Sequence, residues 1–272
     1  MKDIKQISNE IRGLTIECIA SLGSGHIGGS YSIVDVLTVL YYQIMNIDPK
    51  NPSKDDRDKL VVSKGHAGPA VYATLAHRGY FPKEELYTLN KINTNLPSHC
   101  DMNKTIGVDM TTGSLGQGLS CAVGMALASR IKEDKSYIYA IIGDGELEEG
   151  QNWEAAEFAS IQKLDNLIVF LDNNEMQIDD YTYNLVYTGS YVDKWNSFGF
   201  DTYEVDGHDH EAIYNAIVKA KETKGKPHII ILNTIKGKGV SFIEEAKVGN
   251  HSMPISKEQL ETALKELGLG DK

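Results

Sequence analysis

The chain has few cysteines and no long apolar run. Its 272 residues include only Cys18, Cys100 and Cys121, which are scattered and form no CxxC pair. This set excludes a disulfide framework and argues against a structural zinc site. The longest apolar run covers residues 137–142, far short of the roughly 18 residues of a membrane span. The N-terminal segment lacks the apolar core of a secretory signal, so we expect a cytoplasmic protein without a membrane partner.

Positive charge is also scarce. Lys and Arg number 27 against 38 Asp and Glu, which gives a net charge of −11. An acidic surface repels polyphosphate backbones, so we expect no nucleic-acid partner. The chain is 41% hydrophobic and 24% charged, as is typical of a folded globular protein.

Strand-like and helix-like stretches alternate through most of the chain. Apolar stretches predict strands at 59–63, 137–142, 167–171, 202–205 and 228–233. Patterns typical of helices occur at 2–21, 32–45, 67–78, 116–130, 151–163, 209–223 and 257–267. Ser32 is the candidate N-cap of the second helix. The alternation predicts an α/β fold with a doubly wound, mostly parallel sheet that is covered on both faces.

We expect a single domain over residues 1–272. A helical N-terminal region would cover 1–58, the sheet core 59–240 and a C-terminal tail 241–272. The tyrosine-rich segment 181–191 suits a surface loop or a partner contact, and we favour the partner contact.

Two polar motifs follow successive predicted strands. Gly143-Asp144-Gly145 comes directly after the strand at 137–142, and Asn174 follows the strand at 167–171. Ligands of open parallel sheets gather at the carboxyl ends of the strands, and neighbouring strands lie about 4.8 Å apart. Asp144 and Asn174 can therefore share one ion, with a backbone carbonyl just beyond Asn174 as a further ligand. Such oxygen ligands suit Mg²⁺ or Ca²⁺ rather than zinc, and Gly145 lets the backbone approach a phosphate.

Gly-Asp-Gly by itself is a common turn signal. Its order here, with an acidic loop, a helix, an apolar strand and Asn-Asn, resembles the thiamine diphosphate fingerprint. Nearly the whole chain resembles the N-terminal half of a transketolase. This half would be the diphosphate-binding subunit of a split, two-gene enzyme. The other motifs are SGHIGGS at 24–30, SKGHAGPA at 63–70, LPSHCDMN at 96–103, GVDMTTGSLGQGLS at 107–120, KGKGVSFIE at 236–244 and the Asn-His pair at 250–251.

The resemblance implies a cofactor and a metal. Asp144, Asn174 and the main-chain carbonyl of Met176 would bind Mg²⁺, for which Ca²⁺ or Mn²⁺ are possible substitutes. Glu149 resembles the family's acidic residue at the subunit contact. The residues implied to surround thiamine diphosphate are His66, Gly113, Ser114, Leu115, Gly143, Asp144, Gly145, Glu149, Asn174 and His251.

Four histidines are the catalytic candidates. His26, His66 and His99 each lie in a loop rich in Gly, Ser or Pro, which exposes a ring rather than burying it in a core. The resemblance implies that His66 and His251 reach the diphosphate and the reacting centre. It places His99 at the donor hydroxyls and His26 in the substrate channel. Neutral imidazoles can donate to an alkoxide or accept a hydroxyl proton. The histidines interpreted as solvated or structural are His77, His208, His210 and His228.

Two positions depart from the family pattern. Cys100 replaces the usual Pro after His99, which predicts a less rigid loop. Ser252 replaces the usual Gly after His251, which weakens the placement of that histidine.

The resemblance implies transfer of a two-carbon glycolaldehyde unit from a ketose to an aldose, with phosphate or related acidic sugars as substrates. The family's acidic residue beside the aminopyrimidine comes from a second α/β domain, whose sequence does not follow here. We therefore expect this chain to be inactive alone and to need a separate C-terminal pyrimidine-binding subunit in an α₂β₂ heterotetramer. Neither the sugars nor the metal are specified by the sequence.

Three alternatives stay open. Two are other thiamine diphosphate enzyme halves, a 2-oxo acid dehydrogenase α subunit or a 1-deoxyxylulose-phosphate synthase-like fragment. The third is a non-catalytic cofactor-binding module. The loops at His26, His66 and His99 favour transketolase.

Overall fold

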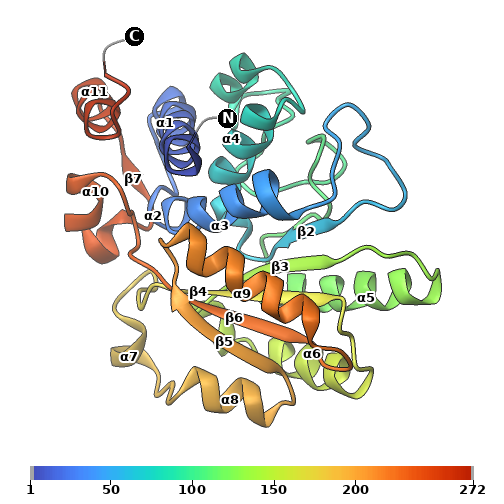
Figure 1. The fold of residues 1–272 in the computed structure, drawn as a ribbon. Helices are drawn as coiled ribbons and strands as arrows, with labels where there is room; N and C mark the ends of the chain where they lie inside the picture. The colour runs from blue at the N-terminus through green and yellow to red at the C-terminus, as the bar shows by residue number, and fades with distance from the viewer. Residues whose placement is uncertain (1–2, 271–272) are drawn as a thin grey trace.

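A five-stranded parallel sheet forms the centre of the protein (Figure 1). The structure is a computed structural model that describes residues 3–270. The strands lie in the order β2 (Lys59–Val62), β3 (Ile138–Gly143), β4 (Leu167–Asn173), β6 (His228–Asn233) and β5 (Asp201–Asp206). All neighbouring pairs are parallel. The five predicted strands are confirmed, with ends that differ by at most two residues.

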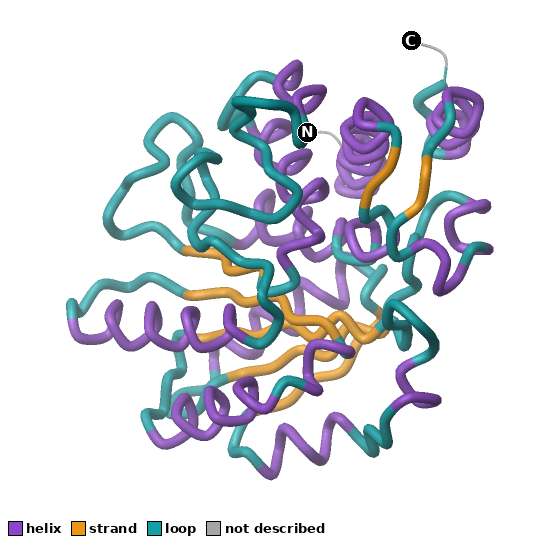
Figure 2. The backbone as a smooth tube through the Cα atoms, turned by 180° about the vertical axis from the view of Figure 1, so that it is seen from behind, coloured by secondary structure: helices purple, strands orange, loops and turns teal. Residues whose placement is uncertain are grey.

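Helices cover both faces of this sheet (Figures 1 and 2). One face is covered by α3 (Val34–Val39), α4 (Gly68–Arg78) and α9 (His210–Glu222), and α1 (Ile4–Leu22) packs on α3 and α4. The other packs against α5 (Gln117–Ile131), α6 (Gly150–Ile161) and α8 (Tyr191–Ser197). Side chains alternate along each strand, so Tyr139 enters the first core while Ile138 and Ala140 enter the second. The predicted doubly wound α/β fold is confirmed.

The helix predicted at 32–45 is confirmed over residues 34–44, but its N-cap is not Ser32 and its last turn is π-helical. The chain forms α2 (Gly28–Tyr31), then α3, then a π-helical turn at Leu40–Ile44. Ile33, not Ser32, occupies the N-cap of α3. The Ser32 hydroxyl instead donates to the buried Asp172 carboxylate at 2.7 Å. A buried carboxylate needs such donors, which explains why the hydroxyl does not cap the helix.

The two ends of the chain meet in a small antiparallel ribbon. Strand β1 (Ser24–Gly25) pairs with β7 (Met253–Pro254). The tail continues from α10 (Ser241–Glu245) to α11 (Lys257–Glu266), which packs on α1. A Cβ at Gly13 of α1 would lie 2.5 Å from Leu269 Cδ1, so a larger residue there would force the Leu269 side chain to shift. The predicted helix at 257–267 is confirmed, whereas the ribbon was not predicted.

The segment 181–191 is not entirely loop, because it contains the short helix α7 (Thr182–Leu185) and the start of α8. Several of its side chains are exposed: Tyr183, Leu185, Val186 and Tyr187. The predicted partner contact at this segment stays a prediction. Among residues 3–270, no helix has the length and apolarity needed to cross a bilayer.

Candidate active site

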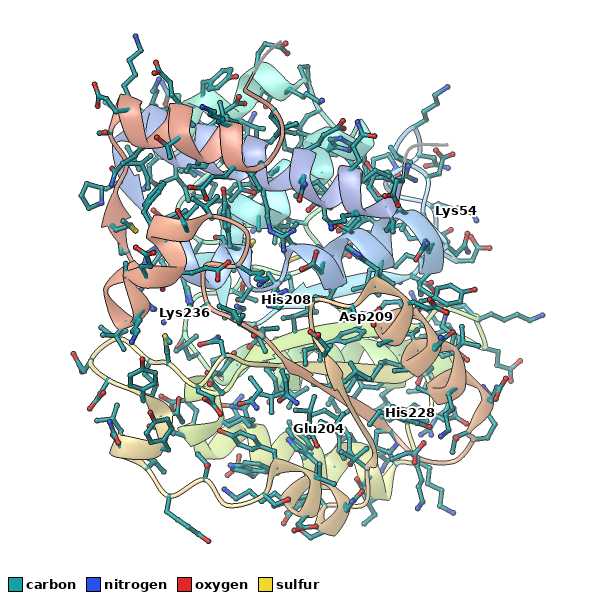
Figure 3. The ribbon with its side chains drawn as sticks, turned by 60° about the vertical axis from the view of Figure 1, so that its left-hand side comes forward. Lys54, Glu204, His208, Asp209, His228 and Lys236 are labelled. Atoms are coloured by element: carbon teal, nitrogen blue, oxygen red, sulfur yellow. The ribbon has the colours of Figure 1, made fainter. Side chains whose placement is uncertain are left out.

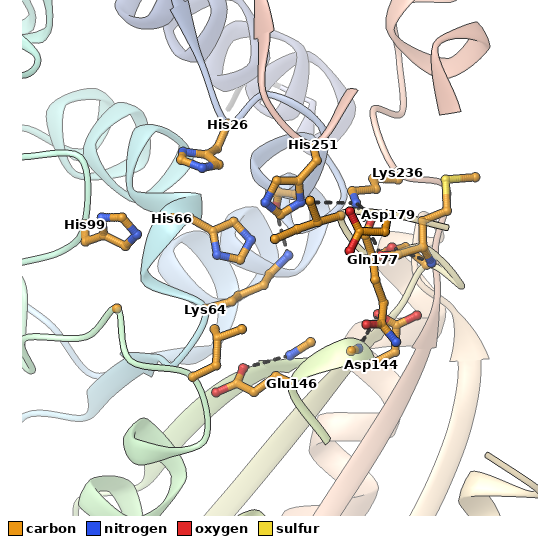
Figure 4. A pocket seen from close by; sticks show the side chains of 18 residues that line it. His26, Lys64, His66, His99, Asp144, Glu146, Gln177, Asp179, Lys236 and His251 are labelled. Atoms are coloured by element: carbon orange, nitrogen blue, oxygen red, sulfur yellow. Dashed lines mark hydrogen bonds between the residues drawn. The ribbon is translucent and has the colours of Figure 1, made fainter. Parts of the chain in front are cut away.

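A cavity of about 360 Å³ lies where the carboxyl ends of the strands meet the helical N-terminal region. It gathers most of the residues singled out from the sequence (Figure 4). Those that line it are His26, His66, His99, Gly113, Leu115, Gly143, Asp144, Gly145, Asn174, Met176 and His251. Two others do not line it: Ser114 is exposed, and Glu149 is exposed at the N-cap of α6.

The predicted metal ligands lie near each other at the carboxyl ends of two neighbouring strands. Strands β3 and β4 are neighbours, with Gly143 opposite Asp172. The Asn174 amide nitrogen donates to Asp172 Oδ2 at 2.8 Å, and its Oδ1 accepts from the Met176 amide at 3.2 Å, which leaves the second lone pair of Oδ1 for a cation. Asp144 is only 3% exposed. Its burial, and then the nearby Asp172 charge, raise the pKa of Asp144 to about 7.

This donor set fits a hard cation. Among the described residues 3–270, no group of three His, Cys, Asp or Glu side chains could hold a metal. A metal here would therefore depend on the Asp144 carboxylate, the Asn174 amide oxygen, the Met176 carbonyl and oxygens from a ligand or water. Mg²⁺ typically uses few protein ligands and completes its octahedron with phosphate and water oxygens. The buried Asp144 carboxylate also needs a positive partner.

Glycines along the same wall let neighbouring side chains pack close to the backbone. A Cβ at Gly145 would lie 2.8 Å from Gln177 Cγ. Gly113 has φ +153°, and a Cβ there would lie 3.2 Å from the His99 ring. Gly143 has no such close neighbour, so its open side faces the cavity. The amides of Gly145 and Gly143 donate to Asp144 at 2.8 Å and to Glu146 at 3.1 Å, so these glycines hold two carboxylates at this wall.

The four candidate histidines form one cluster on the opposite side of the cavity from Asp144 (Figure 4). Ring centroids are 5.3 Å apart for His26 and His66, 5.3 Å for His26 and His251, and 6.0 Å for His26 and His99. The β1–β7 ribbon positions two of these rings, because His26 directly follows β1 and His251 lies two residues before β7.

Three of these imidazoles are held neutral near pH 7. Burial, and then the Lys64 charge, lower the pKa of His66 to about 2. Burial, and then Lys236, lower the pKa of His251 to about 4. Burial, and then His99, lower the pKa of His26. A neutral ring can both donate and accept a hydrogen bond, which suits recognition of sugar hydroxyls.

Two lysines in the cavity wall were missed from the sequence. Lys64 donates to Asp172 Oδ2 at 2.6 Å and to the Gly29 carbonyl at 2.7 Å. Lys236 donates to the carbonyls of Met176 at 3.3 Å and Gln177 at 3.2 Å. Burial, and then Lys64, lower the pKa of Lys236 to about 8. Each lysine follows a strand, β2 or β6, and precedes glycine, a signal that could have identified both.

Glu146 was also missed, and it joins three segments around the cavity. Its carboxylate accepts hydrogen bonds from the Ser63 hydroxyl, the Gly116 amide at 2.8 Å and the Gly143 amide at 3.1 Å. The end of β2, the start of α5 and the end of β3 are thereby held together. Burial raises the pKa of Glu146.

Hydrogen bonds to other segments hold the loop that carries His99. The Thr112 amide donates to the Cys100 carbonyl at 3.0 Å, and the Ser98 amide donates to Asn90 Oδ1 at 3.0 Å. Cys100 itself is buried, which raises the pKa of its thiol to about 12. The predicted lower rigidity relative to a loop with proline stays a prediction.

The remaining histidines lie outside the cavity. His77 interacts with Glu10 at 2.8 Å. His208 and His210 both contact Asp35. His228 is fully buried at the start of β6, so it is structural rather than solvated.

Comparison with known proteins identifies the family. The model of the transketolase thiamine diphosphate-binding domain matches residues 4–272. The chain is 54% identical to the 6-deoxy-6-sulfo-D-fructose transketolase subunit of Clostridium sp. (strain MSTE9), over 97% of this chain and 96% of that protein. It is 41% identical to one of the subunits of the apulose-4-phosphate transketolase of Actinobacillus succinogenes, over 91% of this chain and 89% of that one. Transketolase from Leishmania mexicana has a TM-score of 0.93 at 32% identity, over 100% of this chain.

The chain belongs to the transketolase family and carries its thiamine diphosphate-binding domain. It spans only 42% of the Leishmania enzyme but nearly the full length of relatives that are named as subunits. It is therefore the N-terminal subunit of a split transketolase-type transferase, as the sequence predicted.

Proposed function

We propose that this subunit binds Mg²⁺ and thiamine diphosphate in the cavity and, with a second subunit, transfers a two-carbon unit from an acidic ketose to an aldose. The observation that carries this proposal is the two-sided cavity. A buried oxygen-donor pair and a glycine-lined wall lie on one side, and four clustered histidines lie on the other.

The metal and diphosphate would be held by the strand-end wall. Asp144, Asn174 and the Met176 carbonyl would supply the protein ligands of Mg²⁺. The ammonium of Lys236 would face diphosphate oxygens, because an anion in this cavity would neutralise a buried lysine. The Gly145 amide donates to Asp144 at 2.8 Å and would orient this metal ligand. Lys64 and Asp172 form a buried ion pair that fixes the Asn174 amide.

The histidine wall would hold the sugar. When bound, thiamine diphosphate supplies the carbon nucleophile that attacks the ketose carbonyl. The neutral rings of His26, His99 and His251 would bind the donor hydroxyls and keep the carbonyl in a reactive orientation. His66 would donate a hydrogen bond to the oxygen that becomes negative during the reaction.

A partner subunit is part of the proposal. Two of the relatives are named as subunits, and the chain covers less than half of the solved transketolase. We propose a C-terminal pyrimidine-binding subunit as the partner and α₂β₂ as the assembly. The exposed Glu149 and the segment 181–191 would lie at the contact.

For the donor we propose 6-deoxy-6-sulfofructose. The 54% identity to a transketolase subunit named for that sugar favours it. Apulose 4-phosphate is the second candidate, on 41% identity. Removing two carbons from 6-deoxy-6-sulfofructose leaves a four-carbon aldose that carries the sulfonate at its last carbon.

The test is a co-purified complex of this chain with its pyrimidine-binding partner. The complex would receive Mg²⁺, thiamine diphosphate, an aldose phosphate acceptor and each candidate ketose in turn. We expect the four-carbon sulfonated aldose to appear by mass spectrometry with 6-deoxy-6-sulfofructose. Faster turnover of apulose 4-phosphate would refute the donor, and no ketol transfer from any ketose would refute the proposed activity.

A further inference from the structure

We infer that His208, a histidine outside the cavity, is a positioning residue that holds the backbone of the Lys236 loop, defined here as residues 234–238. This inference rests on the proposed function, because it assigns the loop a role in binding the diphosphate. His208 and Lys236 lie at the same end of the sheet (Figure 3). The His208 ring contacts the loop from outside, whereas Lys236 enters the cavity from the loop.

Each residue of the Lys236 loop has a hydrogen bond to another part of the chain. The five contacts join Thr234 Oγ1 to Asp172 at 2.5 Å, Ile235 N to His208 Nε2 at 2.8 Å, the Lys236 carbonyl to Asn250 at 2.9 Å, Gly237 N to the Gly28 carbonyl at 3.1 Å, and the Lys238 carbonyl to Arg12 at 2.9 Å. A loop that is held at every residue keeps its lysine at a fixed height above the strand ends.

Two of these contacts are made by side chains, Arg12 and His208, that are both bound to one buried carboxylate, Asp35. Asp35 of α3 is 3% exposed and forms a bidentate pair with Arg12, at 3.1 and 2.5 Å. Arg12 Nε also reaches the Lys238 carbonyl, and His208 Nδ1 lies 2.8 Å from Asp35 Oδ2. Asp35 thus anchors both side chains that hold the loop on either side of Lys236.

The carboxylate also determines how His208 meets the loop. Asp35 accepts a hydrogen bond from Nδ1–H, and the Ile235 amide is itself a donor. Nε2 must therefore be the unprotonated acceptor, so His208 is neutral with its proton on Nδ1. The ring thus links Asp35 of α3 to the backbone of Ile235, one residue before Lys236. Removing the ring would leave the Ile235 amide without its acceptor and loosen the loop on that side of Lys236, while the other four contacts remain.

The chain offers a matched control in His210. Its Nε2 contacts Asp35 Oδ1 at 3.0 Å and the Ser8 hydroxyl at 2.7 Å, and within residues 3–270 it makes no hydrogen bond to the Lys236 loop. His208→Ala and His210→Ala both remove one partner of the same carboxylate. Only the first removes a contact to the loop. His208→Gln is the rescue variant, because its amide supplies one donor and one acceptor.

Two measurements test the inference. Hydrogen exchange of the cofactor-free chain should show about tenfold faster exchange at residues 235–238 in H208A, with H210A and H208Q close to wild type. Calorimetric titration of the assembled enzyme with thiamine diphosphate and Mg²⁺ should show about tenfold weaker binding for H208A. H210A and H208Q should stay within about threefold of wild type.

The outcomes are distinguishable. Equal loss of affinity in H208A and H210A would show a general structural role and overturn the inference. Faster exchange in H208A with unchanged affinity would overturn it as well, because the loop would then move without affecting the ligand. A wild-type complex that bound no thiamine diphosphate would instead overturn the proposed function, and the inference with it.

Discussion

Replacing Asp144 with Asn should stabilise the metal-free subunit while abolishing its response to metal and cofactor. Burial and the Asp172 charge raise the pKa of Asp144 from 3.8 to about 7. Between pH 3.8 and about pH 7, Asp144 is therefore protonated in the native state and ionised in the unfolded chain. Stability falls as pH rises through this window, and the full loss is present above pH 7. Asn has the same shape and no charge, so D144N escapes this loss.

The magnitude follows from the same pKa values. At pH 8 the ionised carboxylate costs the native state about 4 kcal/mol, at about 1.4 kcal/mol per pH unit. Asn keeps an oxygen for the Gly145 amide, which now donates to Asp144 at 2.8 Å. It loses one acceptor toward the Glu175 amide, which costs about 1 kcal/mol. Local relaxation around the native carboxylate reduces the gain further, so we expect a net gain of about 2 kcal/mol.

The assay is urea unfolding of the EDTA-treated subunit at pH 8 and pH 5, with thermal melts beside it. D144N should unfold about 4–8 °C higher than wild type at pH 8. The gain should fall to less than half at pH 5. Mg²⁺ with thiamine diphosphate should raise the melting temperature of wild type but not of D144N. A metal-free D144N that was less stable than wild type at pH 8, or that still responded to the cofactor, would refute the reasoning.

Three further predictions concern the same cavity. Lys236→Met should weaken thiamine diphosphate binding more than about tenfold, as measured by calorimetry. The melting temperature should not fall, because burial already disfavours the ammonium. A lower melting temperature with normal affinity would contradict this. Burial lowers the pKa of His66 to about 2. As the pH falls below 6.5, this histidine binds a proton in the unfolded chain but not in the native state, so wild type loses stability. H66Q should lose about 1–2 kcal/mol less between pH 7 and pH 5 in urea unfolding, and an equal loss would count against a buried neutral ring. The purified chain with Mg²⁺ and thiamine diphosphate should show no ketol transfer until the pyrimidine-binding subunit is added; turnover by the chain alone would contradict the need for a partner.

The parts of the fold that were predictable are those with a local pattern. The apolar strands and the amphipathic α9 each carry their own periodicity, and the order of strands and helices then specifies a parallel sheet. Asp144 and Asn174 were found because parallel strands bring their carboxyl ends to one edge. Most of the candidate site followed from that geometry and from the family motifs.

The parts that were missed depend on contacts between distant segments. Ser32 has the chemistry of an N-cap, but Asp172, far along the chain, takes its hydroxyl. The β1–β7 ribbon has two residues per strand, too few for any periodic signal. His208 has an ordinary turn sequence around it, and only the folded chain brings Asp35 and Ile235 to its two nitrogens.

The β1–β7 ribbon has a consequence for biosynthesis. His26 leaves the ribosome long before the strand that pairs beside it and the neighbouring His251, because these lie far along the chain. All five strands of the sheet can have emerged while one of the four cavity histidines, His251, has still to be made. The histidine cluster is complete only once β7 has paired with β1, so a chain cut before residue 251 would lack the His251 ring of that cluster.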